Sequence, residues 1–330
     1  MRTLAISGAI CGLLVLSCCG GPARAQPPHV ISGAVPKDKG PDGNTVILDA
    51  PGGLIVFDTG RHPEHAQAII AYARQKKRPI AAIVNSHWHL DHTTGNWDIR
   101  RAYPRVEVYA SGALEGALAT FLKKSRDGAE QAIADPKTPP AQRDQLERGL
   151  EVIDHPERIR PNHVVSRSGV TTIAGRPLDL RLAKFAATEG DVWIVDRASR
   201  TAIVGDLVVD IVPFMDSACP DGWARALDAI AATPFVTLIP GHGKPMSRVE
   251  FLRWRSAYTK FVACGRSAAA TQACVDGWMR DAAPFIDPDH RDYAPRAAAY
   301  YIETRLRSPR EEQERYCRPL RASVVGRRVL

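Results

Sequence analysis

Two groups of short apolar runs constrain the fold of this chain more than any other feature. The first group lies at residues 45–48, 54–57, 80–84 and 106–109, and the second at residues 170–173, 178–182, 192–195, 202–204 and 236–239. Short apolar runs bounded by glycine and proline are typical of buried β-strands. Because helical patterns follow each group, we expect two sheets packed together with helices outside them, which is a layered α/β fold.

The expected helices follow from the spacing of apolar residues. Residues 66–73 and 223–230 repeat apolar side chains at the period of one helix face. Residues 113–160 are charged and helical in pattern, with prolines that interrupt them, and we interpret them as an insert. Residues 246–330 are predicted to form a helical C-terminal extension without strands.

The N-terminus has the features of an export signal. Arg2 precedes an apolar run over residues 4–16, and Ala23-Arg24-Ala25 matches the A-x-A cleavage pattern. The run is shorter than the roughly 20 residues that a membrane span needs, so we expect no stable membrane span. We therefore predict a periplasmic or secreted protein. The alternative is a lipoprotein signal with an anchor on Cys18.

Charge and cysteine content limit the partners and the compartment. Lys and Arg number 44 against 36 Asp and Glu, and this mild excess is spread along the chain, so we expect no nucleic-acid partner. Four cysteines lie beyond the predicted signal, and an exported chain can pair them in disulfides. Cys264 and Cys274 suit a local bridge, which would leave Cys219 with Cys317, although four cysteines allow three pairings.

The segment from His87 to His92 contains three imidazoles and one carboxylate directly after an apolar run. Imidazole nitrogen and carboxylate oxygen are the ligands that zinc prefers among groups without sulfur. His87 and His89 are two residues apart, so extended backbone points both to the same side. Asp91 and His92 follow in the turn, where they could serve an adjacent position. The segment therefore predicts a site for one or two Zn²⁺ ions.

His87-x-His89-x-Asp91-His92 resembles the H-x-H-x-D-H motif of the metallo-β-lactamase superfamily. Three further segments resemble that family's other landmarks in the same order: Asp58-Thr59-Gly60, Gly205-Asp206 and Pro240-Gly241-His242-Gly243. The resemblance implies a four-layer αββα sandwich over residues 44–245, between a signal peptide (1–25) with a leader (26–43) and the helical extension (246–330).

The resemblance also implies the role of each site residue. His87 and His89 match ligands of a first ion. The second ion is matched by Asp91, His92 and His242, and Asp206 matches the carboxylate that bridges both. Asp58 is expected to hydrogen-bond a ligand histidine. The implied reaction is hydrolysis of a small-molecule substrate, in which a metal-bound hydroxide attacks an ester, thioester or amide-type bond and Asp91 orients the water.

One ligand of the family pattern is missing from this sequence. The family has a histidine in a Gly-His-Thr-x-Gly-Asp segment, and Ala187 stands in its place within Ala186–Asp191. Glu189 is an alternative oxygen ligand, whereas His155 and His163 lie in polar, proline-rich sequence and are expected at the surface.

Two further interpretations follow from Ala187. One is a single-ion site formed by Asp91, His92 and His242, with or without Asp206, which would free His87 or His89 to act as a general base. The other is a binding protein that keeps the fold without catalysis. The sequence leaves the substrate and the oligomeric state open.

Overall fold

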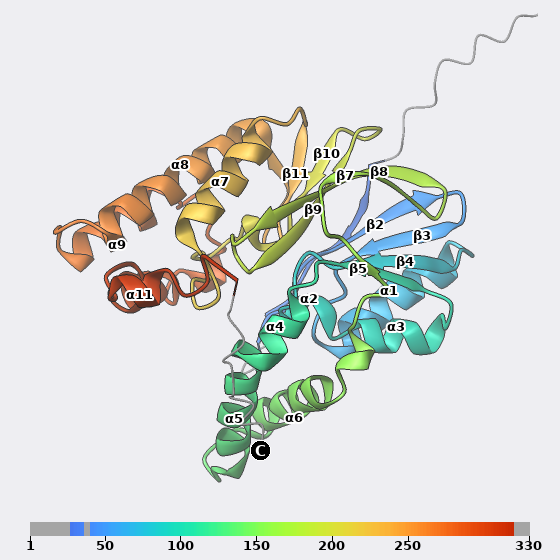
Figure 1. The fold of residues 1–330 in the computed structure, drawn as a ribbon, viewed down its shortest axis with the longest axis horizontal. Helices are drawn as coiled ribbons and strands as arrows, with labels where there is room; N and C mark the ends of the chain where they lie inside the picture. The colour runs from blue at the N-terminus through green and yellow to red at the C-terminus, as the bar shows by residue number, and fades with distance from the viewer. Residues whose placement is uncertain (1–26, 36–39, 320–330) are drawn as a thin grey trace, which may run out of the picture.

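Two six-stranded sheets form the centre of the computed structural model, which describes residues 27–35 and 40–319 (Figure 1). The first sheet has the order β1 (His29–Ile31), β2 (Thr45–Ala50), β3 (Gly53–Phe57), β4 (Ile80–Val84), β5 (Glu107–Ala110) and β6 (His163–Val164). The second has the order β12 (Met246–Ser247), β11 (Thr237–Ile239), β10 (Thr201–Ile203), β9 (Gly190–Asp196), β8 (Arg176–Lys184) and β7 (Gly169–Ile173). The predicted signal peptide, including Cys18, lies outside the described residues.

Alternation along the strands of the first sheet creates two apolar faces. Val46 and Leu48 on β2 belong to the apolar cluster between the two sheets. Ile47 lies between them in sequence and belongs instead to the cluster under α1 (Pro63–Gln75) and α3 (Asn96–Ala102). Successive side chains of a strand point to opposite faces, so this sheet is covered on both sides.

The outer face of the second sheet carries its own helices. Trp223 of α7 (Pro220–Ala231) and Trp254 of α8 (Arg248–Gly265) are fully buried, in one cluster with Trp193 of β9. Figure 1 shows α7 and α8 on the opposite side of the sheets from α1 and α3. The predicted αββα sandwich is therefore confirmed.

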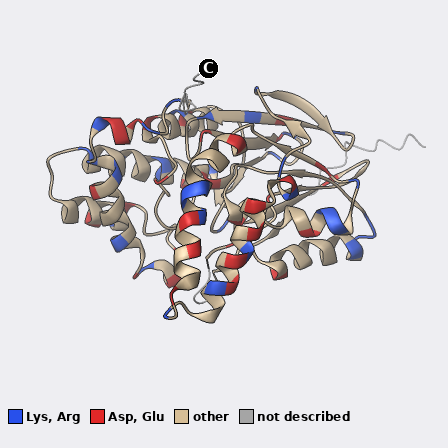
Figure 2. Ribbon diagram, turned by 60° about the horizontal axis from the view of Figure 1, so that its bottom comes forward, with Lys and Arg blue, Asp and Glu red and all other residues tan. Residues whose placement is uncertain are grey.

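The charged insert forms three helices, α4 (Leu114–Ala119), α5 (Phe121–Ala134) and α6 (Pro140–Asp154). Figure 2 shows basic and acidic residues interspersed along the helices that face the viewer. Arg126, for example, pairs with Glu130 on α5 and with Asp154 at the end of α6. Leu122 and Val152 turn the other way and pack with Trp88, so the insert lies against the loop that follows β4.

The C-terminal extension continues with α9 (Thr271–Asp281), α10 (Ala294–Tyr301), a π-helical turn (Ile302–Leu306) and α11 (Arg310–Gln313). The two disulfides found among the described residues lie in this half of the chain. Cys264 pairs with Cys274 across the α8–α9 connection, and Cys219 pairs with Cys317. The second bridge ties the end of the extension to the residue before α7.

Three short edge strands depart from the sequence prediction. β1 lies in the predicted leader and pairs with β2, and β12 lies in the predicted helical extension and pairs with β11. β6 follows the charged insert, where no strand was predicted, and pairs with β5. Strands of two or three residues are too short to show a period of two, so the sequence carried no signal for them. Within the described residues, no helix is both long and apolar enough to cross a bilayer.

Candidate metal centre

The candidate site lies where four strands end. Asp58 directly follows β3, and the segment from His87 to His92 follows β4 and continues into α2 (Leu90–Thr93). On the other sheet, Asp206 follows β10 in a 3₁₀ turn (Gly205–Leu207), and His242 follows β11. β3 is parallel to β4, and β10 is parallel to β11, so each pair of strands delivers its residues to the same edge. Loops at the carboxyl ends of parallel strands commonly form the sites of α/β proteins.

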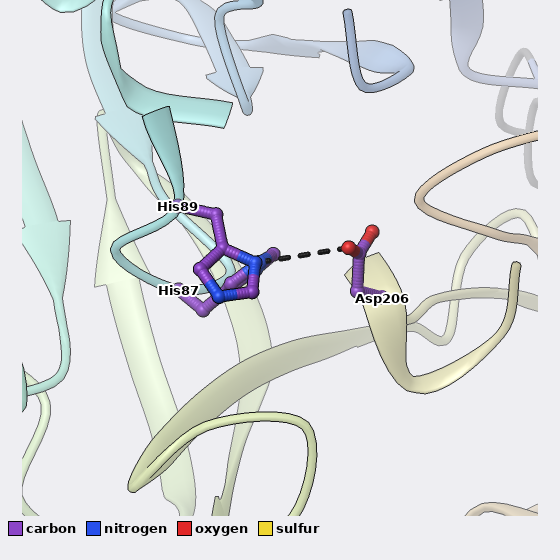
Figure 3. Close-up of side chains that lie close together, drawn as sticks. All are labelled: His87, His89 and Asp206. Atoms are coloured by element: carbon purple, nitrogen blue, oxygen red, sulfur yellow. Dashed lines mark ion pairs between the residues drawn. The ribbon is translucent and has the colours of Figure 1, made fainter. Parts of the chain in front are cut away.

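The structure brings the predicted ligands together in two groups. The first group is His87, His89 and Asp206, whose ligand atoms lie within 4.8 Å of one another. Figure 3 shows the two histidines on one side and the carboxylate opposite them, with His87 Nε2 3.6 Å from Asp206 Oδ2.

The second group is Asp91, His92 and His242. His242 Nε2 lies 3.2 Å from Asp91 Oδ2 and 3.2 Å from His92 Nε2. Asp206 Oδ1 lies 3.1 Å from His92 Nε2 and 3.5 Å from His242 Nε2. Asp206 therefore lies between the two groups, as a bridging carboxylate would.

Polar atoms without hydrogen-bond partners indicate that these residues fit a cation. His87 Nε2 is buried without a hydrogen-bond partner, and Asp206 Oδ1 is buried with only the ligand nitrogens of His92 and His242 near it. Leaving a buried polar atom unpaired costs about 1–3 kcal/mol, and more for a charged one. A zinc ion coordinated by both atoms would remove this penalty, and imidazole and carboxylate are its preferred ligands without sulfur.

Asp58 sets the orientation of two of the histidines. Its Oδ2 lies 2.8 Å from His92 Nδ1 and accepts a hydrogen bond of 2.7 Å from Ser86 Oγ. The Ser86 hydroxyl uses its one hydrogen in that bond, so at 2.8 Å it accepts from His87 Nδ1. Both rings then carry a proton on Nδ1 and direct Nε2 toward the site, where a metal would take the place of any proton on Nε2.

Ser217 performs the same task for His89. Its hydroxyl donates to the Ala187 carbonyl at 3.0 Å and lies 2.9 Å from His89 Nε2. Since the hydroxyl hydrogen is used on Ala187, Ser217 accepts from His89 Nε2–H, and Nδ1 is the nitrogen left for a metal. Ser217 is fully buried in the loop before α7.

Burial favours neutral histidines in the first group, and nearby carboxylates favour cation binding in the second. Burial lowers the pKa of His87 well below its ordinary value and lowers the pKa of His89 to about 4. Burial also opposes the charged form of His92, but the carboxylates of Asp206, Asp58 and Asp91 outweigh it and raise the pKa of His92 well above its ordinary value. The same carboxylates would stabilise a bound dication.

The segment that lacks the family histidine folds as a tight turn. Thr188 donates from its backbone and its hydroxyl to the carboxylate of Asp191, which fixes the turn. Ala187 is buried in an apolar cluster and offers the site only its carbonyl, through Ser217. Glu189 accepts a hydrogen bond from the Trp88 indole and belongs to neither ligand group.

His155 and His163 lie at the surface. Both side chains are exposed, and each pairs with a surface glutamate. Neither belongs to a ligand group. This placement agrees with the expectation from sequence that both would lie at the surface.

A cavity of about 940 Å³ opens over the two groups. Among the ligands, His89, Asp91, Asp206 and His242 line it. Apolar walls come from the insert, the loop after Asp206 and the C-terminal extension, and they include Trp88, Phe121, Leu150, Val212, Phe214 and Tyr301. Arg61 and Lys244 also line the cavity, and Arg61 Nη2 lies 3.7 Å from Asp91 Oδ1.

Sequence reasoning missed Ser86, Ser217 and Arg61. Ser86 is adjacent to the motif, so a search for hydroxyl partners of the histidines could have found it. Ser217 and Arg61 meet the site only through the fold, and no spacing in the sequence identifies them.

Known proteins resemble the chain in both sequence and fold. It is 27% identical over 229 residues to a linear primary-alkylsulfatase from Pseudomonas sp. (strain ATCC 19151), a match that covers 62% of this chain and 42% of the relative. The solved sec-alkylsulfatase Pisa1 from Pseudomonas sp. shares the fold at 19% identity, with a TM-score of 0.51 over 71% of this chain and 42% of that chain. The chain thus spans less than half the length of these alkylsulfatases.

Smaller proteins match over nearly their whole length. The DIM-1 metallo-beta-lactamase exposed to ceftazidime aligns with a TM-score of 0.50 at 13% identity, over 71% of this chain and 98% of that one. Residues 39–242 match the family model described as the metallo-beta-lactamase superfamily, and this range includes every ligand of both groups. The chain is therefore a member of the metallo-β-lactamase superfamily.

Proposed function

We propose that this protein is an exported zinc-dependent hydrolase that cleaves an ester-type bond in a small molecule with an apolar part. The observation that carries the proposal is the convergence of both ligand groups on one cavity, with His87 Nε2 buried and without a hydrogen-bond partner. A structural site would be closed off by protein, whereas four of these six ligands line an open cavity, as catalytic zinc ligands do.

The two ligand groups are proposed to hold zinc unequally. Asp91, His92 and His242, with Asp206 beside them, form the principal site, and His87 and His89 with Asp206 form a weaker one. Zinc, when bound, supplies a water of lowered pKa and polarises the bond to be cleaved. Asp91 positions the water, and Arg61, at 3.7 Å from Asp91, attracts a negatively charged part of the substrate.

The cavity supports a substrate with an alkyl or aryl group. Its volume and its aromatic and aliphatic walls suit an apolar chain, whereas a small polar ester would leave much apolar surface in contact with water. The 27% identity to a linear primary-alkylsulfatase makes sulfate esters of alkyl alcohols the first class to test. Carboxylic esters, thioesters, phosphoesters and lactones are the next classes.

The cysteine pairs support export. Two disulfides within one chain are stable in an oxidising compartment such as the periplasm and are rare in the cytosol. Together with the signal-like residues 1–25, they favour a periplasmic or secreted protein over a cytosolic one.

The test is a hydrolysis panel on the purified chain, measured with zinc, after chelation and after zinc is restored. The panel contains octyl sulfate, para-nitrophenyl sulfate, ethyl and para-nitrophenyl butyrate, a thioester, a phosphodiester, a lactone and a β-lactam. We expect turnover of at least one ester, loss on chelation and recovery with zinc. Turnover that persists in the chelated protein would contradict the metal mechanism.

A second candidate function rests on Ala187. Because this position supplies no ligand, the chain could be a binding protein that keeps the fold without catalysis. Less than one zinc per chain, together with no turnover on the whole panel, would favour this candidate over the hydrolase.

A further inference from the structure

One histidine of the cavity belongs to neither ligand group. His290 lies in a 3₁₀ turn (Pro288–His290) of the C-terminal extension, beyond the residues that match the superfamily model. It lines the same cavity as the ligands Asp206 and His242. The Asp287 carboxylate accepts the backbone N–H of Asp289, and this bond fixes the turn that presents His290.

His290 faces a buried carboxylate without a hydrogen bond between them. Its Nδ1 lies 3.8 Å from Asp210 Oδ2, and both His290 Nδ1 and Asp210 Oδ1 are buried and without partners. Asp210 itself is 8% exposed. Two such atoms lose hydration without compensation, so the pair is built to interact with each other or with a ligand rather than to stabilise the fold.

Asp210 is held beside the ligand loop that carries His242. Gly243 has a φ of +95°, and a Cβ at that position would come within 2.5 Å of the Asp210 Cβ. The Asn44 amide donates to the carbonyls of Pro240 and Gly243 and fixes this loop. The arrangement therefore places Asp210 against the residue that follows His242, and His290 lies beyond Asp210 in the same cavity. Lys244, Asp287, Asp289 and Tyr293 are the other charged or titratable side chains that line this end of the cavity.

Hydrolysis of an unactivated ester needs a proton donor as well as a nucleophile. An alkoxide is a strong base and leaves slowly unless a proton reaches its oxygen in the transition state. Imidazole is the side chain that most often supplies such a proton near neutral pH. Histidines that bind zinc cannot do so, because their nitrogens are used by the metal and by their orienting partners.

We propose that His290, oriented by Asp210, is the catalytic proton donor to the leaving oxygen of the substrate. This assignment rests on the proposed hydrolase function. Water forms the new bond to the acyl or sulfuryl centre and releases one proton to solvent. The bond from that centre to the alcohol oxygen breaks, its electron pair stays on the oxygen, and the oxygen takes the proton of His290. Solvent then returns a proton to the imidazole.

The test compares leaving groups in the His290→Asn variant. Para-nitrophenolate is a weak base that leaves without a proton. Ethoxide and phenoxide are stronger bases, so their departure depends more on a proton donor. We expect kcat/KM to fall about 100- to 1,000-fold for ethyl butyrate but less than about 5-fold for para-nitrophenyl butyrate, since general acid catalysis contributes about 10²–10⁴-fold. Phenyl sulfate and para-nitrophenyl sulfate form a second pair. We expect the variant to lose more kcat/KM on phenyl sulfate than on para-nitrophenyl sulfate.

Controls separate catalysis from folding and metal binding. His155→Asn changes an exposed histidine outside the cavity and should leave kcat/KM unchanged for both substrates of each pair. Asp210→Asn should produce the same leaving-group dependence with a smaller loss, and both cavity variants should keep the zinc content of the wild type.

Three outcomes would overturn the assignment. An equal loss on both members of a pair would show that His290 has only a structural role. Activity on octyl sulfate alone, by cleavage of its C–O bond and not its S–O bond, would also overturn the assignment. In that reaction the leaving group is sulfate, which leaves without a proton. If the wild type cleaves no ester at all, the proposed function fails and the role of His290 fails with it.

Discussion

The two ligand groups share Asp206 but differ in how the chain supports them. In the second group, Asp58 binds His92 directly, and the carboxylates of Asp91 and Asp206 lie within 4 Å of His92 Nε2. In the first group, Asp206 is the sole carboxylate, and Ala187 stands where the superfamily pattern has a histidine. The difference teaches that the substitution at Ala187 removes a side chain from one group only, because apart from Asp206 each group has its own side chains and its own orienting partners.

The largest expected effect is the loss of the second group. His242→Ala or Asp91→Ala removes a proposed ligand, which should weaken the tighter zinc site more than the 10- to 100-fold typical of an orienting residue. Turnover should fall to background. Zinc content after dialysis, together with the hydrolysis rate, checks this prediction. His163→Ala is the matched control because His163 is exposed and outside the site. A His242→Ala protein with full zinc content would contradict the assignment of the principal site.

Asp58 should affect both groups at once. It orients His92 directly and His87 through Ser86, so Asp58→Asn should weaken zinc binding about 10- to 100-fold in both groups. Asparagine is the suitable replacement because residue 58 has a φ of +59°, a left-handed conformation that asparagine tolerates better than alanine. Calorimetric titration of the zinc-free variant with zinc measures both binding steps, one for each ligand group. An effect on one step alone would mean that Asp58 does not support both groups.

Substitution of Ser217 should weaken zinc binding in the first group alone, and this is the smallest of the three expected effects. Ser217→Ala removes the acceptor of the His89 ring proton, so zinc binding in the first group should weaken about 10-fold. Visible spectra of the cobalt-substituted protein report the coordination of each ion and can show which group changes. Ser267→Ala, at an exposed serine that bonds a helix carbonyl, is the control. A change in the second group would place Ser217 in a different role.

The sequence predicted the parts of this molecule whose signals are local. Buried strands such as β4 and the segment from His87 to His92 carry their pattern within a few residues. Asp206 and His242 are far from that segment, and they were found because they stand in the order that the superfamily resemblance implies. Their convergence on Asp91 and His92 needed the fold.

The residues that were missed act through tertiary contacts. Ser217 is 128 residues from His89, and an isolated serine in a loop has no feature that separates it from any other. The sequence does not single out His290 either. Its neighbour Asp210 lies on a different element, and the two residues approach each other only because of how the C-terminal extension packs. The physical reason is the same for both: a pair contact across the fold leaves no periodicity in the chain.

The central claim is that the two groups bind zinc unequally because Ala187 supplies no ligand, and a calorimetric zinc titration of the zinc-free protein tests it most directly. The wild type should bind one ion tightly and a second at least about 10-fold more weakly, a difference of about 1.4 kcal/mol. Ala187→His should strengthen the weaker step and leave the tighter one unchanged, with circular dichroism to check that the variant is folded. Two ions of equal affinity in the wild type would contradict the account.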